Sequence, residues 1–195
     1  MAIGRPRTFN KEQALDQALE VFWRKGYEGA SICDLTVAMG INPPSLYTAF
    51  GNKKALFRQA LDRYAETRAG FIREALAVAK ARDGIMALLR GTAQSLADKS
   101  SPAGCLLVQG IAGAGDHAQC IRDELTARRA ASQKAIRERL KRAQAEGELP
   151  ADADPAALAR YFSTVIQGMA IQAASGASRK ELERVAETAM RAWPD

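Results

Sequence analysis

The chain has 195 residues, which allows a small domain and a second one of about 130 residues with a real core. Its 28 lysine and arginine residues against 22 aspartate and glutamate residues give a net charge of +6. No apolar run approaches the ~20 residues needed to span a membrane, and the start lacks the apolar stretch of a signal peptide. We therefore expect no membrane-spanning segment and a cytoplasmic protein. Three cysteines without CxxC spacing favour reduced thiols.

The first helix is predicted to follow Asn10 and to stop at Gly26. Asn10 can cap its first turn, with Gln13 as the capping partner. Apolar residues then recur with helical spacing, so one face of the helix is expected to be buried. These residues are Leu15, Ala18, Leu19, Phe22 and Trp23.

Residues 31–50 indicate two short helices joined by a tight turn. Ser31 can cap the first helix, with Asp34 completing a capping box. Gly40 suits the left-handed residue that ends this helix, and Asn42 can cap the second one. Two short helices joined by a glycine-containing turn form a helix-turn-helix, whose second helix enters the DNA major groove. An ordinary helical hairpin would give the same local pattern.

The outer face of the second short helix is chemically unusual. Leu46 and Phe50 are expected to point inward, which leaves small hydroxyl side chains and a tyrosine outside. Such side chains can approach base edges and phosphates closely, whereas a purely structural surface helix more often carries Glu, Lys and Gln. The outward residues are Pro44, Ser45, Tyr47 and Thr48.

A set of residues between 22 and 57 matches the pattern of one family. The set comprises Phe22, Gly26, Tyr27, Ser31, Ile32, Leu35, Gly40, Ile41, Ser45, Leu46, Tyr47, Phe50, Lys53, Leu56 and Phe57. With these residues, the stretch from 8 to 57 resembles the DNA-binding domain of the TetR/AcrR family of bacterial transcriptional regulators. The chain departs from the family pattern at Cys33, Thr36, Met39, Asn42, Ala49 and Lys54, which leaves the base contacts open.

The resemblance implies which groups contact double-stranded DNA. Tyr47 and Lys53 would each bind a phosphate, and the backbone amide of Ser31 would bind another at a helix N-terminus. The candidates for base contacts are Pro44, Ser45 and Thr48.

The two N-terminal arginines are a separate prediction. Arg5 and Arg7 flank a proline that holds them extended, which suits a narrow minor groove with its enhanced negative potential. A disordered basic tail is an equal alternative. Residues 1–60 hold 8 basic and 5 acidic residues, so positive charge is denser there, consistent with a polyanion partner.

Beyond residue 52 the pattern is helical almost throughout, without a strand pattern or a repeat. We therefore expect an all-α chain of about nine helices, with a helix-turn-helix domain at residues 1–52 and an effector-binding and dimerisation domain at residues 53–195. The expected segments are one long helix over 55–80, a helix over 83–99, a short buried segment over 104–108, a long helix over 118–146, and two last helices over 155–175 and 178–192.

The last two helices carry more apolar surface than one core needs, which indicates an oligomer interface. In the resembled family these helices form a dimeric four-helix bundle, so we expect a homodimer. A two-fold dimer would read a palindromic operator in successive major grooves. The alternative is that both helices complete the core of a monomer.

The resemblance also implies a small-molecule effector in the larger domain, which would release a repressor from its operator. An apolar pocket suits a hydrophobic or aromatic compound, although each candidate wall residue is equally explained as core. We expect no cofactor and no metal. The candidate wall residues are Phe71, Met86, Leu89, Cys105, Leu106, Phe162, Ile166 and Met169.

Three alternatives remain at this point. The first is a regulator that senses thiol reagents or electrophiles through Cys105, because some family members with a similar Gly-Cys-x-x-Val segment look like thiol sensors. An inert buried thiol is the simpler interpretation of Cys105, because no adjacent basic residue activates it. An enzyme is not expected, since the single histidine, His117 beside Asp116 and near Cys120, has no further catalytic partners. The size of the second domain argues against an architectural protein without a ligand.

Overall fold

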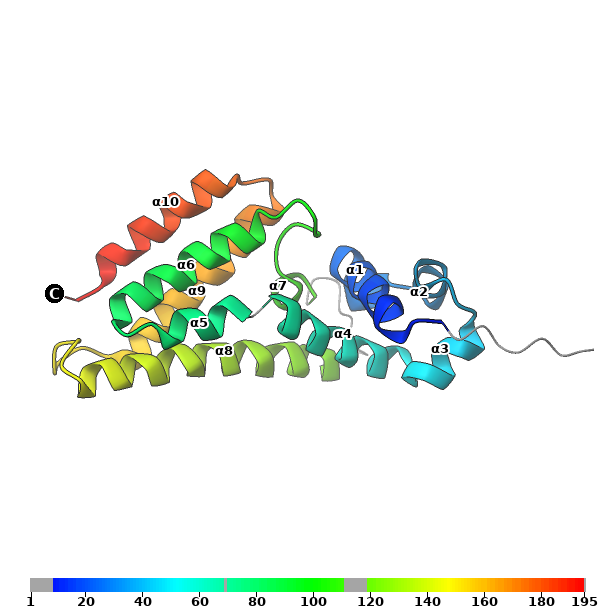
Figure 1. Cartoon of the computed structure of the whole chain (residues 1–195), viewed down its shortest axis with the longest axis horizontal. Coiled ribbons are helices and arrows are strands. Elements are labelled where there is room, and N and C mark those ends of the chain that lie inside the picture. Colours follow the sequence, from blue (N-terminus) through cyan, green and yellow to red (C-terminus); the bar gives the residue numbers. More distant parts are fainter. Residues whose placement is uncertain (1–8, 69, 111–118, 195) are drawn as a thin grey trace, which may run out of the picture.

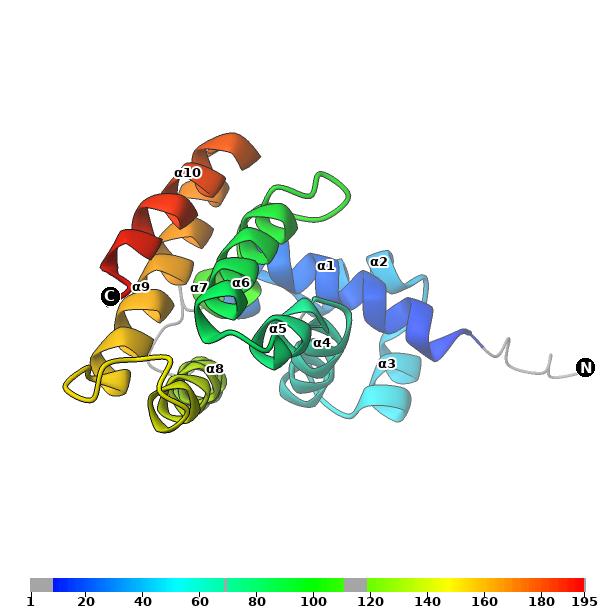
Figure 2. The same cartoon turned by 60° about the vertical axis from the view of Figure 1, so that its left-hand side comes forward.

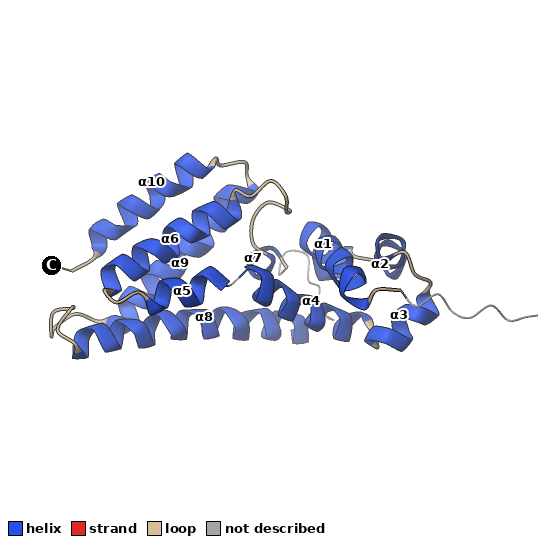
Figure 3. Cartoon of the chain, viewed as in Figure 1, coloured by secondary structure: helices blue, strands red, loops and turns tan. Residues whose placement is uncertain are grey.

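Every regular element that the structure describes is a helix. The computed structural model describes residues 9–68, 70–110 and 119–194 (Figure 3). The prediction of an all-α fold is thus confirmed. The elements are α1 (Lys11–Gly29), α2 (Ile32–Met39), α3 (Pro43–Phe50), α4 (Lys53–Arg68), α5 (Gly70–Ala77), α6 (Ala81–Leu96), α7 (Leu106–Gln109), α8 (Gln119–Ala145), α9 (Pro155–Ala174), α10 (Arg179–Ala189) and a 3₁₀ turn (Met190–Ala192).

The molecule is elongated, with the three N-terminal helices at one end and the larger helical domain at the other (Figure 1). Helix α4 leads from α3 towards the larger domain, and α8 runs along one side of that domain. In the turned view of Figure 2, α9 and α10 lie next to each other at the edge away from α1–α3. No helix among the described residues is long and apolar enough to cross a membrane.

The N-terminal core is closed by aromatic rings from α1 and α4. The ring of Phe57 packs edge-on against Phe22, with ring centroids 4.9 Å apart, and against Tyr27 at 5.1 Å. Leu35 of α2 and Leu46 of α3 are fully buried in the same cluster. Because α4 supplies part of this core, its first half packs as one unit with the helix-turn-helix.

The prediction of one long helix over 55–80 is wrong, because the chain forms two helices there. Helix α4 ends at Arg68, and α5 begins at Gly70, a residue type with low helix propensity. Separate helices allow Phe71 to lie against α6 at Gly91, where an added Cβ would be only 2.5 Å from a carbon of the Phe71 ring. The described residues accordingly form ten α-helices, not nine.

The segment over 104–108 is only partly buried, contrary to expectation. Gly104 and Leu106 are buried, whereas Cys105, Leu107 and Val108 are half-buried. These three residues help to line a cavity that is partly open to solvent, which leaves their side chains incompletely packed. The other expected helices in this domain are confirmed, with ends that differ by a few residues.

Candidate DNA-binding surface and internal cavity

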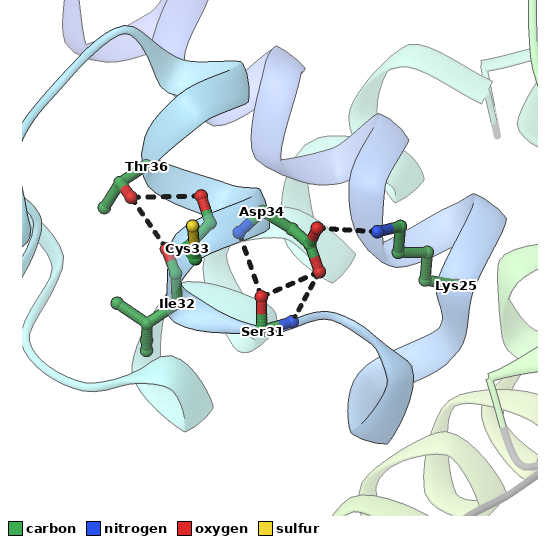
Figure 4. Close-up of polar contacts among 6 residues, drawn as sticks. All are labelled: Lys25, Ser31, Ile32, Cys33, Asp34 and Thr36. Carbon is green, nitrogen blue, oxygen red and sulfur yellow. Dashed lines mark hydrogen bonds and ion pairs between the residues drawn. The ribbon is translucent and has the colours of Figure 1, made fainter.

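The start of α2 is fixed by a capping box (Figure 4). The Asp34 amide donates to Ser31 Oγ at 3.0 Å, and the Ser31 amide donates to Asp34 Oδ2 at 3.0 Å. Lys25 of α1 donates to the other carboxylate oxygen at 2.7 Å. The bonds from Lys25 and Ser31 lower the pKa of the Asp34 carboxyl from 3.8 to about 2. Asp34 therefore joins α1 to α2 as a carboxylate.

The capping box also engages the group that was predicted to bind a phosphate. Both donors of Ser31, its amide and its hydroxyl, are directed to Asp34 Oδ2. The amides of Ile32 and Cys33 lie in the same first turn, where N–H groups have no intrahelical acceptor. An anion at the start of α2 would meet those two amides more readily than that of Ser31.

The turn between α2 and α3 has the expected geometry. Gly40 adopts φ 64° and ψ 30°, a left-handed conformation, and the Ile41 amide donates to the Thr36 carbonyl oxygen at 3.1 Å. Asn42 Oδ1 accepts from the Ser45 amide at 2.8 Å and caps α3. The helix-turn-helix prediction is confirmed.

Helix α3 presents the predicted outer face. Leu46 is fully buried, whereas Pro44 and Thr48 are exposed and the Tyr47 side chain is 50% exposed. Ser45 is half-buried at the edge of this face. Because α3 carries no charged side chain, any cation that meets a DNA backbone here must come from a neighbouring element.

Lys53, the first residue of α4, is a cation on the next helix. Its ammonium lies over the Tyr27 ring, 4.5 Å from the centroid, a favourable cation–π geometry. Partial burial lowers the pKa of Lys53, an effect opposed by the charge of Glu28. Asn52 Oδ1 caps α4 by accepting from the Ala55 amide at 2.9 Å, a cap that sequence reasoning missed despite asparagine being a common capping residue. Arg5 and Arg7 lie outside the described residues.

A cavity of about 300 Å³, partly open to solvent, lies among α4, α5, α6, α7, α8 and α9. Most of its wall is apolar, and the polar groups come mainly from α6, α8 and α9. The apolar residues are Leu61, Ala65, Phe71, Ile72, Leu88, Leu96, Leu107, Val108, Ala131, Ile136, Ile166 and Ala170. The others are Tyr64, Thr92, Ser95, Cys105, Arg128, Arg129, Ser132, Ser163 and Gln167.

The cavity brings together three of the predicted wall residues, Phe71, Cys105 and Ile166. The other five lie elsewhere because their helices turn them into packed cores. Leu89, Phe162 and Met169 are buried in the core of the larger domain, Met86 packs half-buried against that core, and Leu106 is buried in the N-terminal cluster.

Two arginines of α8 were not predicted at this site. Arg128 donates to Asp62 of α4 at 2.6 Å and to Glu124 at 2.9 Å. Arg58 of α4 also pairs with Glu124, at 3.3 Å. Arg128 thus contacts both the cavity and α4. The four-residue spacing between Glu124 and Arg128 can be read from the sequence, but the sequence does not show which side of α8 faces the cavity.

Cys105 lies in the cavity wall, half-buried, with the Tyr64 hydroxyl donating to its sulfur at 3.3 Å. Tyr64 belongs to α4 and its ring packs edge-on against Trp23 of α1. The thiol therefore directly contacts α4, the helix that leads to α1–α3. Asp116 and His117 lie outside the described residues, and Cys120 is half-buried.

The helix-turn-helix and the separate cavity-bearing domain define a DNA-binding regulatory protein. The model of bacterial regulatory proteins of the tetR family matches residues 14–60, and that of the tetracyclin repressor-like C-terminal domain matches residues 81–189. The chain belongs to the TetR family.

Two relatives that the chain matches are named as transcriptional repressors. It is 36% identical to the HTH-type transcriptional repressor ComR of Escherichia coli, over 98% of this chain and 92% of ComR. It is 37% identical to the repressor BdcR of Escherichia coli over 55% of each chain. Among solved structures, a cysteine mutant of the TetR family regulator CifR, complexed with 26-bp operator DNA, is 43% identical with a TM-score of 0.94; the match covers 97% of this chain and 100% of that one.

Proposed function

We propose that the chain is a homodimeric transcriptional repressor that leaves a palindromic operator when a small hydrophobic molecule enters the cavity. The observation that carries the proposal is the exposed face of α3, held on buried Leu46 and Phe50 in a fold shared with operator-bound CifR. In this proposal Tyr47 and Lys53 bind phosphates, and Arg5 and Arg7 enter a minor groove. The base contacts come from Pro44, Ser45 and Thr48.

Binding to the DNA upstream of the chain's own gene tests the repressor function. Footprinting should show a palindromic protected site, and log Kd should rise linearly with log salt because phosphate contacts release counterions. Thr48→Val should change the preferred sequence, while Tyr47→Phe should weaken all sites alike. Absence of any protected site at low salt would argue against autoregulation.

The dimer is proposed to form through α9 and α10. Three large apolar side chains there are exposed in the single chain, namely Tyr161 at 39%, Ile171 at 55% and Val185 at 41%. Gly168, between them on α9, has open space around an added Cβ. A partner helix packed at this position would make that space unavailable.

Gly168→Leu therefore tests the interface, since the single chain accommodates the new side chain and a dimer would not. Sedimentation should show a monomer for Gly168→Leu and a dimer for Ala127→Leu, a control on the exposed surface of α8. A dimer of unchanged stability in Gly168→Leu would place the interface elsewhere.

Release is proposed to act through α4. This helix contributes Leu61, Tyr64 and Ala65 to the cavity wall, and Leu56 and Phe57 to the N-terminal core. A ligand that displaces the cavity-lining half would tilt the half that supports α3. Coupling of about 1–3 kcal/mol is the usual scale, which corresponds to a roughly 5–150-fold change in DNA affinity.

A screen of apolar compounds tests this release. A true effector should raise the melting temperature and free the operator from the wild type. Both effects should weaken in Gly91→Ala, because the added methyl would lie 2.5 Å from the Phe71 ring and displace it within the cavity wall. Compounds that act equally on Gly91→Ala bind outside the cavity.

A thiol-sensing regulator is the second candidate, favoured by the place of Cys105 in the cavity wall beside the Tyr64 hydroxyl. N-ethylmaleimide should then release the operator from wild type and from Cys33→Ser, which lacks the exposed thiol of α2. Release should be lost in Cys105→Ser. Equal release from Cys105→Ser would eliminate this mechanism.

A further inference from the structure

The cavity combines an apolar wall with a positive charge. Its wall includes the adjacent Arg128 and Arg129, and no aspartate or glutamate among the described residues lines it. Burying an unpaired cation in an apolar environment is costly, so the partners of each arginine determine which ligands the cavity would bind.

The two arginines differ in how their charges are compensated. Arg128 is paired with two carboxylates, Asp62 and Glu124. Arg129 instead donates to the Leu107 carbonyl oxygen at 2.6 Å and to Thr126 Oγ1 at 3.0 Å. Neither acceptor carries a charge, so Arg129 leaves about one positive charge at the cavity. A guanidinium has five N–H donors, and these two bonds leave donors for a ligand.

This charge lies towards one end of the cavity. Along α8 the lining residues run from Arg128 and Arg129 to Ile136, about 10 Å further along the helix at 1.5 Å per residue. Arg129 is bonded to α7, while Ile136 packs in the core of the larger domain. The cavity therefore has its positive charge towards one end, and most of the remaining wall is apolar.

We propose that the effector is an amphipathic organic anion, a carboxylate whose head group binds Arg129 and whose apolar body extends towards Ile136 and Ile166. That this ligand controls operator binding rests on the proposed function, whereas its binding in the cavity does not. A carboxylate matches the planar guanidinium and forms short, charge-assisted hydrogen bonds with it. A cavity of about 300 Å³ has room for a medium-sized acid rather than for a long lipid.

Matched pairs of acid and amide test the inference by calorimetric titration of the full-length protein. The probes are octanoate and 4-phenylbutanoate, each with its primary amide, which keeps the shape and removes the charge. We expect at least one acid to bind ~10-fold or more tightly than its amide, the scale of one charge-assisted pair. Equal affinity of acid and amide in both pairs, or no binding of either acid, would overturn the inference.

Arg129→Gln removes the charge while keeping a polar side chain with N–H donors. It should bring acid and amide to within about twofold of each other. Arg137→Gln, on the same helix but away from the cavity, should keep the wild-type ratio. An unchanged ratio in Arg129→Gln would overturn the assignment of Arg129. If that variant fails to fold, Arg129→Lys, which keeps the charge but loses the fork, should retain a preference for the acid.

Operator release separates this inference from the proposed function. An acid that binds through Arg129 without releasing the operator would support the inference and contradict ligand-controlled release. Operator release by amides as effectively as by acids would support ligand-controlled release and contradict the inference.

Discussion

The proposed DNA-facing surface and the cavity are built from the chain in different ways. The described side chains that we propose to face DNA lie between Ser31 and Lys53, and caps and a glycine turn within this stretch set their directions. The cavity wall extends from Leu61 to Ala170 and depends on how six helices pack. The first site is therefore robust to changes elsewhere, whereas the second can change its ligand without changing the fold.

The largest expected effect distinguishes the core of the larger domain from its cavity. Phe162 is fully buried, so Phe162→Ala should lower the free energy of unfolding by about 3–5 kcal/mol. Ile166→Ala, one turn further at the cavity wall, should cost about 1 kcal/mol because its neighbours are already incompletely packed. Urea unfolding measures both. Equal losses would mean that the cavity collapses in solution.

The next effect concerns the cation of the DNA-facing surface. Lys53→Ala should weaken operator binding by about 1.5–3 kcal/mol, the range for a hydrogen bond to a charged group. The slope of log Kd against log salt should fall by about one, because one phosphate contact is lost. Fluorescence anisotropy across a salt series gives both quantities. Lys54→Ala, at the neighbouring lysine, is the control; a larger effect there would assign the contact to Lys54.

A smaller effect tests the local construction of the turn. Gly40→Ala should destabilise the helix-turn-helix by about 1–2 kcal/mol, the cost of a left-handed conformation for a residue with a Cβ. The cost is one of backbone conformation, because nothing lies within 4 Å of a Cβ added at Gly40. Gly70→Ala, with similar space but no positive φ, should be neutral or slightly stabilising. Thermal unfolding compares them. A neutral Gly40→Ala would mean that the turn can relax.

The smallest effect is a pH dependence from Asp34. Its pKa is lowered from 3.8 to about 2 in the folded protein, so its stabilising contribution is complete above pH 3.8 and is lost as the pH falls through about 2. Melting temperatures of wild type and Asp34→Asn should differ most above pH 4 and converge near pH 2. A constant difference across this range would assign the contribution of Asp34 to something other than its charge.

The local features were predictable from the sequence, and the reasons are physical. Ser31, Asp34, Gly40 and Asn42 form the caps and the turn through bonds to residues within five positions, so their spacing alone encodes these features. The bond from Lys25 to Asp34 spans nine positions and is not encoded in this way. The division between residues 52 and 53 stays a prediction, since α4 packs with the N-terminal core and also lines the cavity.

The cavity was only partly predictable. Leu88 and Leu89 are both apolar and adjacent on α6, yet only Leu88 lines the cavity. Hydrophobicity identifies residues that avoid water but not which side of a buried helix meets empty space. Arg128 and Arg129 were missed for the opposite reason, because charged residues on a long polar helix are usually assigned to solvent.

The sharing of α4 has a consequence for the cell. In the proposed mechanism, a helix that belongs to both sites would link their occupancies thermodynamically. If the effector weakens operator binding by some factor, the operator weakens effector binding by the same factor. Protein bound to DNA would then need more effector than free protein. The concentration at which transcription begins would therefore depend on how many operators compete for each dimer, as well as on the cavity itself.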